Sequence, residues 1–438
     1  MTLALVVLLL PFLQLGLSFY ASFSTLAAVL CLASAGLRTL LTPRIFACLF
    51  IVWAMISAAA LHPLADTRDI LRAGREGLCF LMIIALLRHN VRLDERTARL
   101  VLRCLGFVAM GLALMVIAQT IGLRRGVFLS LPHDLFVINS NTLPTELDLR
   151  YSRVRPSGPF GEPSYLAAAS TVLVLALAPL WPVSRQARYT IMVLAVATFL
   201  SMSMLGIASM SVALGLTLMR TGKKRLRTVV FAMIGIATAT AFIASGVIAD
   251  RTLAILHGED LSFNSRIAEP LLAIPYVLGS SPFGIPIRVF IDMGHLPGMS
   301  TANESFSHNA IFNTLINYGI IGVAMLVALI RSARGGLMIA ILFVLLMQNG
   351  AFWSFDKVTL VAMTVVIQQI ASGRVSVSTS VKGFVNRSPA KLPQIRSKEA
   401  PRGSAHADTA SHPDRRSQLW RPGRRDFRHY PLPRRTGT

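Results

Sequence analysis

The sequence contains few charged residues, and this shortage already restricts the class of protein. Only 14% of its 438 residues are Asp, Glu, Lys or Arg, whereas 54% are hydrophobic. A soluble domain of this length does not need the apolar runs of about twenty residues that recur along the chain. The composition therefore predicts an all-α polytopic membrane protein.

Cysteine is also scarce, and its spacing excludes two further classes. The four cysteines fall in or beside apolar segments, and they do not form a Cys-x-x-Cys pair: Cys31, Cys48, Cys79 and Cys104. Such cysteines behave as small apolar residues within a membrane protein. Neither a disulfide framework nor a zinc site is indicated, and we expect no metal or cofactor.

Acidic residues are outnumbered, at 20 against 43 basic ones, which gives a formal net charge of +23. The segment after Ser372 holds fifteen basic and four acidic residues, and most of the remaining excess lies in short loops between apolar runs. This distribution follows the positive-inside rule of membrane proteins. It does not resemble a groove that binds nucleic-acid phosphates, so we expect no nucleic-acid partner.

Apolar runs and basic loops together predict about twelve transmembrane helices with both termini in the cytoplasm. The basic connections are expected on the cytoplasmic side: 88–103, 185–188, 220–227 and 331–334. The other connections are expected outside: 66–76, 124–162, 201–206, 250–309 and 348–357.

Three regions follow from this topology. Residues 1–123 are expected to form N-terminal transmembrane helices, and residues 124–372 a membrane region whose two long extracytoplasmic loops, 124–162 and 250–309, are the candidates for an active site. Residues 373–438 are rich in Ser, Pro, Arg and His, and we expect a basic, disordered cytoplasmic tail.

The first long loop ends in a cluster of residues suited to anion binding. Arg153 and Arg155 precede two glycines, and Glu162 stands at the mouth of the span that begins at Pro163. A planar guanidinium can hold a phosphate through two parallel hydrogen bonds. In the alternative reading, the arginines only mark the membrane interface and Glu162 only complements the helix dipole. Composition alone leaves both readings open.

The second long loop carries Arg266 and Arg288 and closes at Ser307-His308-Asn309, immediately before an apolar run. A histidine at this boundary titrates near neutral pH and can serve as a general base toward a sugar hydroxyl. Alternatively, Ser307 or Asn309 caps the helix and His308 is only an interfacial residue. The combination of this histidine with extracytoplasmic arginines favours a catalytic function.

Three motifs carry a resemblance to a known family. They are R-P-S-G-P-F-G-E-P-S at 155–164, N-S-R at 264–266 and S-H-N-A-I-F-N-T-L-I-N-Y-G-I-I-G at 307–322. In order and spacing they resemble the O-antigen ligase and Wzy-type polysaccharide polymerase superfamily, over roughly residues 105–370. The Phe-x-Glu-Pro-Ser form resembles polymerases of exopolysaccharide or O-antigen repeat units more than ligases.

The resemblance implies a metal-independent, inverting glycosyltransferase in the bacterial inner membrane, with its active site facing the periplasm. The implied donor is a glycan on undecaprenyl pyrophosphate. Arg155 and Arg266 match the arginines that hold the pyrophosphate, and His308 matches the histidine that activates the acceptor hydroxyl. We add Glu162 as a second base or an orienter of the acceptor. Further candidates for substrate binding are Arg153, Arg288 and Asn309.

Membrane lipids are expected partners, and a chain-length regulator is a further candidate. Two alternatives to a polymerase are an O-antigen ligase, which moves the finished glycan onto lipid A-core, and a polysaccharide or small-molecule transporter or flippase. A transporter is expected to carry charged residues within its spans. In this sequence the charges gather in the two long outer loops, which favours an enzyme.

Overall fold

The computed structural model describes residues 2–13, 15, 22–35, 43–88, 93–129, 154–160, 162–219, 269–296, 309–347, 351–373 and 375–376. The chain divides into two units, Met1–Thr379 and Ser380–Thr438, and all described residues belong to the first. Within them the fold is helical, apart from one parallel pair of two-residue strands, β1 (Leu93–Asp94) and β2 (Val375–Ser376).

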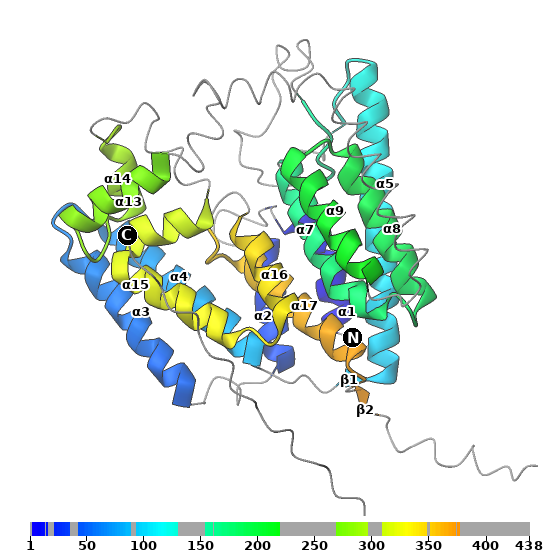
Figure 1. Ribbon diagram of the computed structural model, residues 1–438, viewed down its shortest axis with the longest axis horizontal. Helices are drawn as coiled ribbons and strands as arrows, with labels where there is room; N and C mark the ends of the chain where they lie inside the picture. The colour runs from blue at the N-terminus through cyan, green and yellow to red at the C-terminus, as the bar shows by residue number, and fades with distance from the viewer. Residues whose placement is uncertain are drawn as a thin grey trace, which may run out of the picture. The chain divides into compact units, whose positions relative to one another are not determined.

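The helices follow one another as Figure 1 shows. The N-terminal ones are α1 (Thr2–Leu9), η1 (Leu10–Phe12), α2 (Phe23–Ala35), α3 (Pro43–Leu61), α4 (Thr67–Arg88) and α5 (Glu95–Arg124). Next are α7 (Pro163–Leu177), η4 (Ala178–Leu180), α8 (Arg185–Leu200) and α9 (Met204–Met219). The remaining ones are α13 (Glu269–Ser280), α14 (Ile287–Asp292), α15 (Ala310–Ser332), α16 (Gly336–Leu346) and α17 (Phe355–Ala371).

Three of the described helical segments are long and apolar enough to cross a membrane: Glu95–Arg124, Pro163–Leu180 and Ala310–Ser332. Shorter apolar helices accompany them, including Ile45–Leu61 and Gly206–Met219. The predicted fold class, an all-α membrane protein, is therefore confirmed. The count of twelve spans stays a prediction, because the expected span at 229–248 lies outside the described residues.

Helix α7 lies at the centre of the described bundle. It packs against α8, α9, α16 and α17, and α17 in turn packs against α2 and α4. Every residue from Leu166 to Leu177 is buried. A helix that is predominantly apolar on all faces can be surrounded in this way, although the buried Ser170 Oγ has no hydrogen-bond partner among the described residues. Because α7 begins at Pro163, this rigid core directly supports the Glu162-Pro163 junction.

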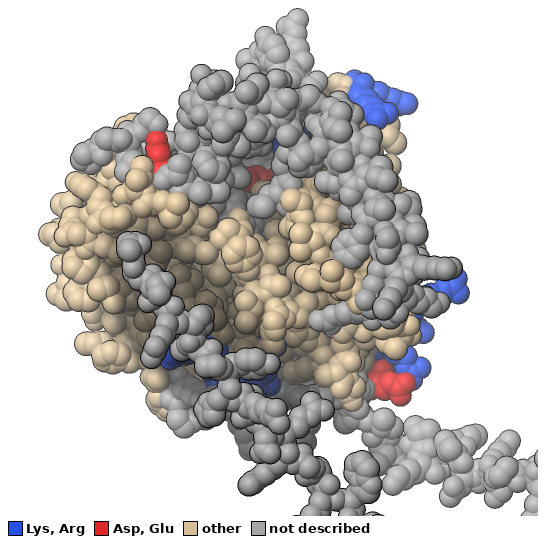
Figure 2. Space-filling view, in the orientation of Figure 1, with Lys and Arg blue, Asp and Glu red and all other residues tan. Residues whose placement is uncertain are grey.

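Aromatic side chains are exposed on the outer helices. Phe50 and Trp53 of α3 are 66% and 63% exposed, and Phe107 of α5 is 75% exposed. Figure 2 shows the charged side chains of one face near its upper, lower and right-hand edges, with a broad uncharged area between them among the described residues. Such a surface suits contact with hydrocarbon rather than water.

Helix α15 is broken at Gly319, whose φ and ψ are 51° and −126°. The sequence predicts a single uninterrupted span here. Instead, the loop after α13 enters the break: Ile320 N–H donates to the Pro282 carbonyl at 3.0 Å, and Ile285 N–H donates to the Ile316 carbonyl at 2.8 Å. Backbone groups freed by a broken helix need partners within the protein when water is excluded. The inserted loop supplies those partners.

The described contacts join loops that the sequence places on the same side of the membrane. Arg88 Nε donates to Ser332 Oγ at 3.2 Å, and β1 pairs with β2, so three segments expected in the cytoplasm lie together. Arg155 likewise contacts the α8–α9 turn, and Arg288 contacts Asp66, which joins segments expected outside.

The break in α15 predicts a strong effect of Gly319→Ala. A Cβ there would lie 2.1 Å from the Pro282 carbonyl oxygen, and the positive φ is strained for any L side chain. We expect a loss of roughly 2–4 kcal/mol in the free energy of unfolding. Thermal unfolding of the purified protein in detergent measures it.

Gly111→Ala in α5 is the matched control, because a Cβ there meets no described atom within 4 Å. Alanine is the better helix former, so we expect this variant to be unchanged or slightly stabilised. Equal melting temperatures for Gly319→Ala and Gly111→Ala would contradict the described geometry of the break.

Candidate functional site

The structure describes four of the seven predicted site residues: Arg155, Glu162, Arg288 and Asn309. The other three, Arg153, Arg266 and His308, lie outside the described residues. The convergence of Arg155, Arg266 and His308 on one pocket therefore stays a prediction. For the four described residues, the structure shows which neighbouring groups hold each side chain or its backbone in place.

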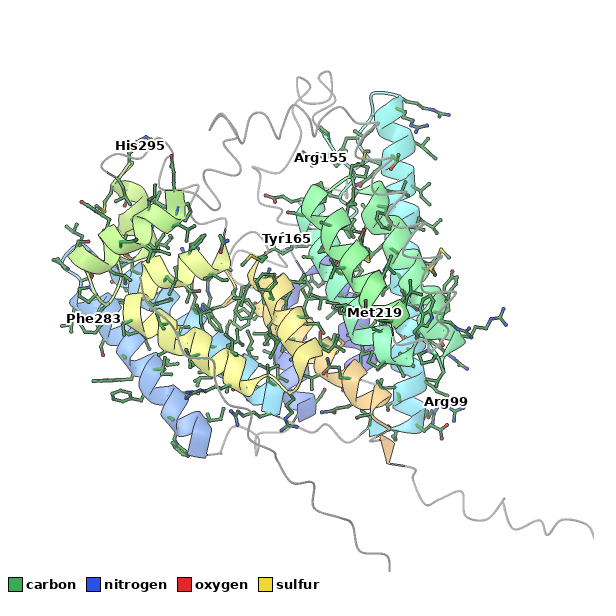
Figure 3. The ribbon with its side chains drawn as sticks, viewed as in Figure 1. Arg99, Arg155, Tyr165, Met219, Phe283 and His295 are labelled. Carbon is green, nitrogen blue, oxygen red and sulfur yellow. The ribbon has the colours of Figure 1, made fainter. Side chains whose placement is uncertain are left out.

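Arg155 is exposed, and the five residues that follow it, from Pro156 to Phe160, are buried. One guanidinium nitrogen, Nη1, donates to the carbonyl oxygen of Met202 at 3.3 Å. Met202 belongs to the turn between α8 and α9, and its φ of 50° is unusual for a residue other than glycine. Figure 3 shows Arg155 at the end of the α7–α9 bundle opposite to Arg99. The guanidinium thus emerges from a buried turn at one end of the bundle.

Glu162 is the N-cap residue of α7, and Pro163 occupies the first helical position, as the sequence predicts. Its half-buried carboxylate accepts a hydrogen bond from Ser164 Oγ at 2.9 Å. Within the described start of α7, the Glu162 side chain makes no capping bond to the helix backbone. The carboxylate lies near the positive end of the helix dipole, so the alternative in which Glu162 only complements that dipole stays open.

A buried charge cluster lies one helical turn after Glu162. Lys357 Nζ donates to Asp356 Oδ2 and to the Tyr165 hydroxyl, each at 3.0 Å, and it lies 4.2 Å from the centroid of the Tyr165 ring. The Lys357 side chain is 0% exposed and that of Asp356 is 13% exposed. Two charges removed from water need this degree of pairing. The cluster fastens the first turn of α7 to the first turn of α17.

Arg288 is engaged in ion pairs at the surface. It pairs with Asp66, and its Nε lies 3.9 Å from Asp292. Partial desolvation raises the pKa of Asp66, but backbone N–H groups and the Arg288 guanidinium outweigh it, so the pKa lies below its ordinary value. Arg288 therefore joins the α3–α4 connection to α14. These ion pairs give the Arg288 side chain a structural role.

Asn309 is the N-cap of α15, and its Oδ1 accepts hydrogen bonds from Ile311 N–H at 3.0 Å and Phe312 N–H at 3.3 Å. The first half of the helix is fixed further by Trp353, whose indole N–H donates to Thr314 Oγ1 at 3.0 Å. These contacts agree with the alternative in which Asn309 caps the helix. They also mean that the residue directly before Asn309, at position 308, precedes a firmly held helix.

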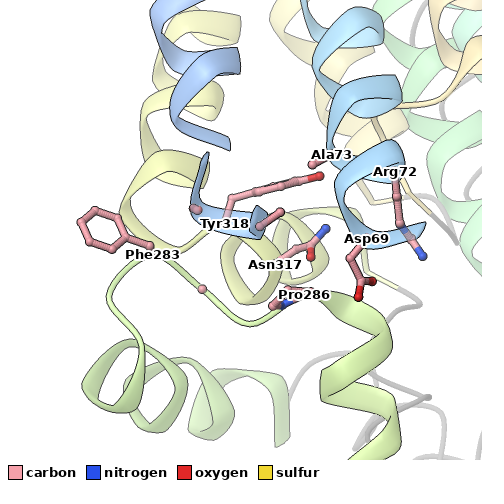
Figure 4. Close-up of a pocket in the computed structure, with 10 residues that line it drawn as sticks. Asp69, Arg72, Ala73, Phe283, Pro286, Asn317 and Tyr318 are labelled. Atoms are coloured by element: carbon pink, nitrogen blue, oxygen red, sulfur yellow. The ribbon is translucent and has the colours of Figure 1, made fainter. Parts of the chain in front are cut away.

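A third anchor joins the first half of α15 to α4. Tyr318 donates to Glu76 Oε2 at 2.8 Å, and Arg72 Nε donates to Glu76 Oε1 at 2.8 Å. Glu76 is only 1% exposed. Beside these groups is a small pocket that is partly open to solvent, and Figure 4 shows Tyr318 reaching from α15 toward α4 across it.

Sequence reasoning missed these buried polar anchors. It placed Glu76 in the outer connection 66–76 and Lys357 in the outer connection 348–357, whereas both are buried within helices. It also left Gln119 unremarked among the apolar residues of α5, where it is 0% exposed. A single amide or charge inside an otherwise apolar run is the sequence signal for such a residue.

Comparison with known proteins identifies a family. The family model described as WcaD colanic acid polymerase matches residues 1–370. None of the curated proteins and none of the solved structures matches the chain. The family match includes the N-terminal helices, which carry none of the three motifs, and it ends before the basic tail.

The buried cluster at α7 and α17 predicts the effect of Asp356→Asn. This change would leave the Lys357 ammonium buried without its counter-charge, and we expect a loss of about 3–5 kcal/mol in the free energy of unfolding. The double variant with Lys357→Met removes the stranded charge and should recover most of that loss. Thermal unfolding in detergent tests both, and an Asp356→Asn protein as stable as its parent would contradict the pairing.

Proposed function

The chain belongs to the WcaD colanic acid polymerase family, and on this premise we propose that it joins lipid-linked repeat units into a polysaccharide. The family match spans nearly the whole described structure, and the three motifs of Wzy type lie within it. An all-α membrane fold suits such an enzyme, because its substrate is held in the bilayer by a lipid.

The observation that carries the proposal is the placement of Arg155. Its exposed guanidinium directly precedes a buried turn, and Arg155 lies seven residues before Glu162 at the mouth of α7. An arginine held at the end of a helical bundle can reach the pyrophosphate of a membrane-anchored lipid. This arrangement supports the role that the first motif implies for Arg155.

The proposed reaction is an inverting glycosyl transfer from an undecaprenyl-pyrophosphate-linked glycan. The oxygen of an acceptor sugar hydroxyl attacks the anomeric carbon of the donor from the face opposite the pyrophosphate. The new glycosidic bond forms as the bond from that carbon to the pyrophosphate oxygen breaks. The lipid pyrophosphate departs with the electron pair, and the hydroxyl proton passes to His308.

Arg155 and Arg266 stabilise the negative charge that develops on the leaving pyrophosphate. Fixed guanidiniums do this without reorganisation, and their effect is stronger in a site that excludes water. Glu162 orients the acceptor or serves as a second base. Arg153, Arg288 and Asn309 remain candidates for contacts with the glycan, although the ion pairs of Arg288 and the capping bonds of Asn309 already give these two a structural use.

We place this reaction at the periplasmic face of the bacterial inner membrane. Two contacts support an assignment of the loops to two sides of the membrane. Arg88 contacts Ser332 in one set of loops, and Arg155 contacts Met202 in the other. Basic connections assign the first to the cytoplasm by the positive-inside rule. Membrane lipids surround the helices, and a chain-length regulator is a candidate partner at the outer side.

The roles of the arginines and the histidine are tested with purified protein and lipid-linked repeat units extracted from cells that lack the polymerase. We expect Arg155→Ala, Arg266→Ala and His308→Ala each to lower the rate of polymer formation by roughly 10²–10³-fold, the usual effect of removing a charge-stabilising donor or a general base. Arg155→Lys should also be severely impaired, because a point charge cannot replace the planar fork.

Arg99→Ala is the matched control. Arg99 is exposed, pairs with Glu95 at 2.9 Å, and lies at the other end of the bundle in Figure 3. We expect its rate to equal that of the parent. Membrane abundance should be the same for all variants, and a near-parental rate for any of the three alanine variants would remove that residue from the mechanism.

The product separates a polymerase from the two alternatives. Cells without this protein should keep single lipid-linked repeats and lose long chains, and the purified protein should form oligomers on the lipid carrier. A ligase would instead leave long carrier-linked chains unattached when it is absent. A transporter would move the glycan across vesicles without forming any glycosidic bond, and that result would overturn the proposed function.

A further inference from the structure

Gln119 is a fully buried amide in α5, 0% exposed, at the end of that helix nearest the first long loop. Burying an amide among apolar side chains is unfavourable unless its polar atoms are hydrogen-bonded. A residue of this kind in a membrane-spanning helix therefore calls for a specific set of partners. Those partners are all backbone groups near the two ends of the first long loop, 124–162.

The amide makes four hydrogen bonds. Its Nε2 donates to the carbonyl oxygen of Leu129 at 2.8 Å and to that of Gly158 at 2.9 Å. Its Oε1 accepts from the N–H of Ser157 at 3.0 Å and from that of Gly158 at 2.8 Å. Two donors and two acceptor lone pairs are the full capacity of a glutamine side chain. The amide orientation is therefore determined by its backbone partners.

These bonds account for the buried turn that follows Arg155. In the sequence Pro156-Ser157-Gly158-Pro159-Phe160, the two prolines have no N–H, and the N–H of Phe160 donates to the Ser157 carbonyl at 3.3 Å. The two remaining N–H groups both bond to Gln119. Every backbone donor in the turn thus has a partner, as a buried segment requires.

The turn is also conformationally restricted. Gly158 has a φ of 64°, which favours glycine at this position. Pro156 disfavours the helical conformation for the residue before it, which is Arg155. The backbone position of Arg155 is therefore coupled to the turn, and the turn is coupled to the Gln119 amide.

We propose that Gln119 is a positioning residue, whose side-chain amide holds the 156–158 turn and thereby aims the Arg155 guanidinium at the pyrophosphate. The inference rests on the proposed function of Arg155. It adds that the charge-stabilising arginine depends on a neutral residue of another helix, 36 positions earlier in the chain. Because Gln119 is fully buried and bonds only to backbone groups, its proposed effect passes through Arg155.

Two nearly isosteric replacements separate the bonds. Gln119→Glu keeps acceptors for the N–H groups of Ser157 and Gly158 but loses the donors to Leu129 and Gly158. Gln119→Met loses all four bonds while it fills similar space. We expect kcat to fall roughly 10-fold in the first and roughly 10²-fold in the second, with KM for the lipid-linked repeat unit within about 3-fold, because the misplaced arginine acts on transition-state charge.

Thr120→Val is the control on the adjacent position of α5. Its hydroxyl donates only within its own helix among the described contacts, to the Val116 carbonyl at 2.7 Å. We expect its kcat to lie within about 2-fold of the parent, since a back-bonded threonine contributes little. Thermal unfolding in detergent verifies that each variant is folded, and if Gln119→Met does not fold, Gln119→Glu alone decides the outcome.

A double-mutant cycle with Arg155→Ala distinguishes positioning from a general structural effect. If Gln119 acts through Arg155, its replacement should lower kcat by less than about 2-fold in the Arg155→Ala background. An undiminished loss in that background, or a parental kcat for both Gln119 variants, would overturn the inference and leave the role of Arg155 intact. A parental kcat for Arg155→Ala itself would instead overturn the proposed function.

Discussion

Irregular backbone that is buried away from water must find its hydrogen-bond partners within the protein, and this constraint governs the described structure. Two irregular stretches stand out among the apolar helices. One is the turn at 156–158, held by the Gln119 amide, and the other is the break at Gly319, filled by the Pro282 loop. The first lies in the R-P-S-G-P-F-G-E-P-S motif and the second in the motif that contains His308. In both motifs the backbone departs from regular helix, and in both another segment of the chain supplies hydrogen bonds to the irregular part.

Support of this kind has a direct chemical consequence. An arginine that stabilises a leaving group is most effective when it is already in place, because reorganisation during the reaction would consume the benefit. The Gln119 amide and Pro156 restrict the backbone at Arg155, while the buried contacts of Lys357 with Asp356 and Tyr165 hold the first turn of α7 after Glu162. Two functional candidates on adjacent segments are therefore carried by rigid surroundings.

Much of the fold follows from the sequence. The apolar runs predict α3, α7 and α16, and the missing N–H of Pro163 predicts where α7 begins, because a proline suits the first helical position. The turn between α8 and α9 lies where Ser201 and Ser203 interrupt a run too long for one helix. Each of these features depends on residues close together in the chain, so the sequence suffices to predict them.

Other features depend on partners that are distant in the chain, and sequence reasoning did not find them. The break at Gly319 exists because a loop more than thirty residues earlier supplies hydrogen bonds to it. A glycine within an apolar run does not reveal such a partner. The sequence places Lys357 in an outer connection, and only the structure shows its contact with Tyr165. In the same way, only the structure shows that Gln119 bonds to Gly158. The motif residues themselves could be selected from the sequence, whereas their anchors could not.

The central claim is that Arg155, Arg266 and His308 meet at one periplasmic pocket around the pyrophosphate of the donor. The most direct measurement is an experimental density map of the protein in a lipid nanodisc with an undecaprenyl-pyrophosphate-linked repeat unit bound. The account predicts both guanidiniums within about 3 Å of pyrophosphate oxygens and the His308 imidazole within hydrogen-bond reach of an acceptor hydroxyl at the anomeric carbon. A map that places His308 on the cytoplasmic side, or Arg155 away from the pyrophosphate, would contradict it.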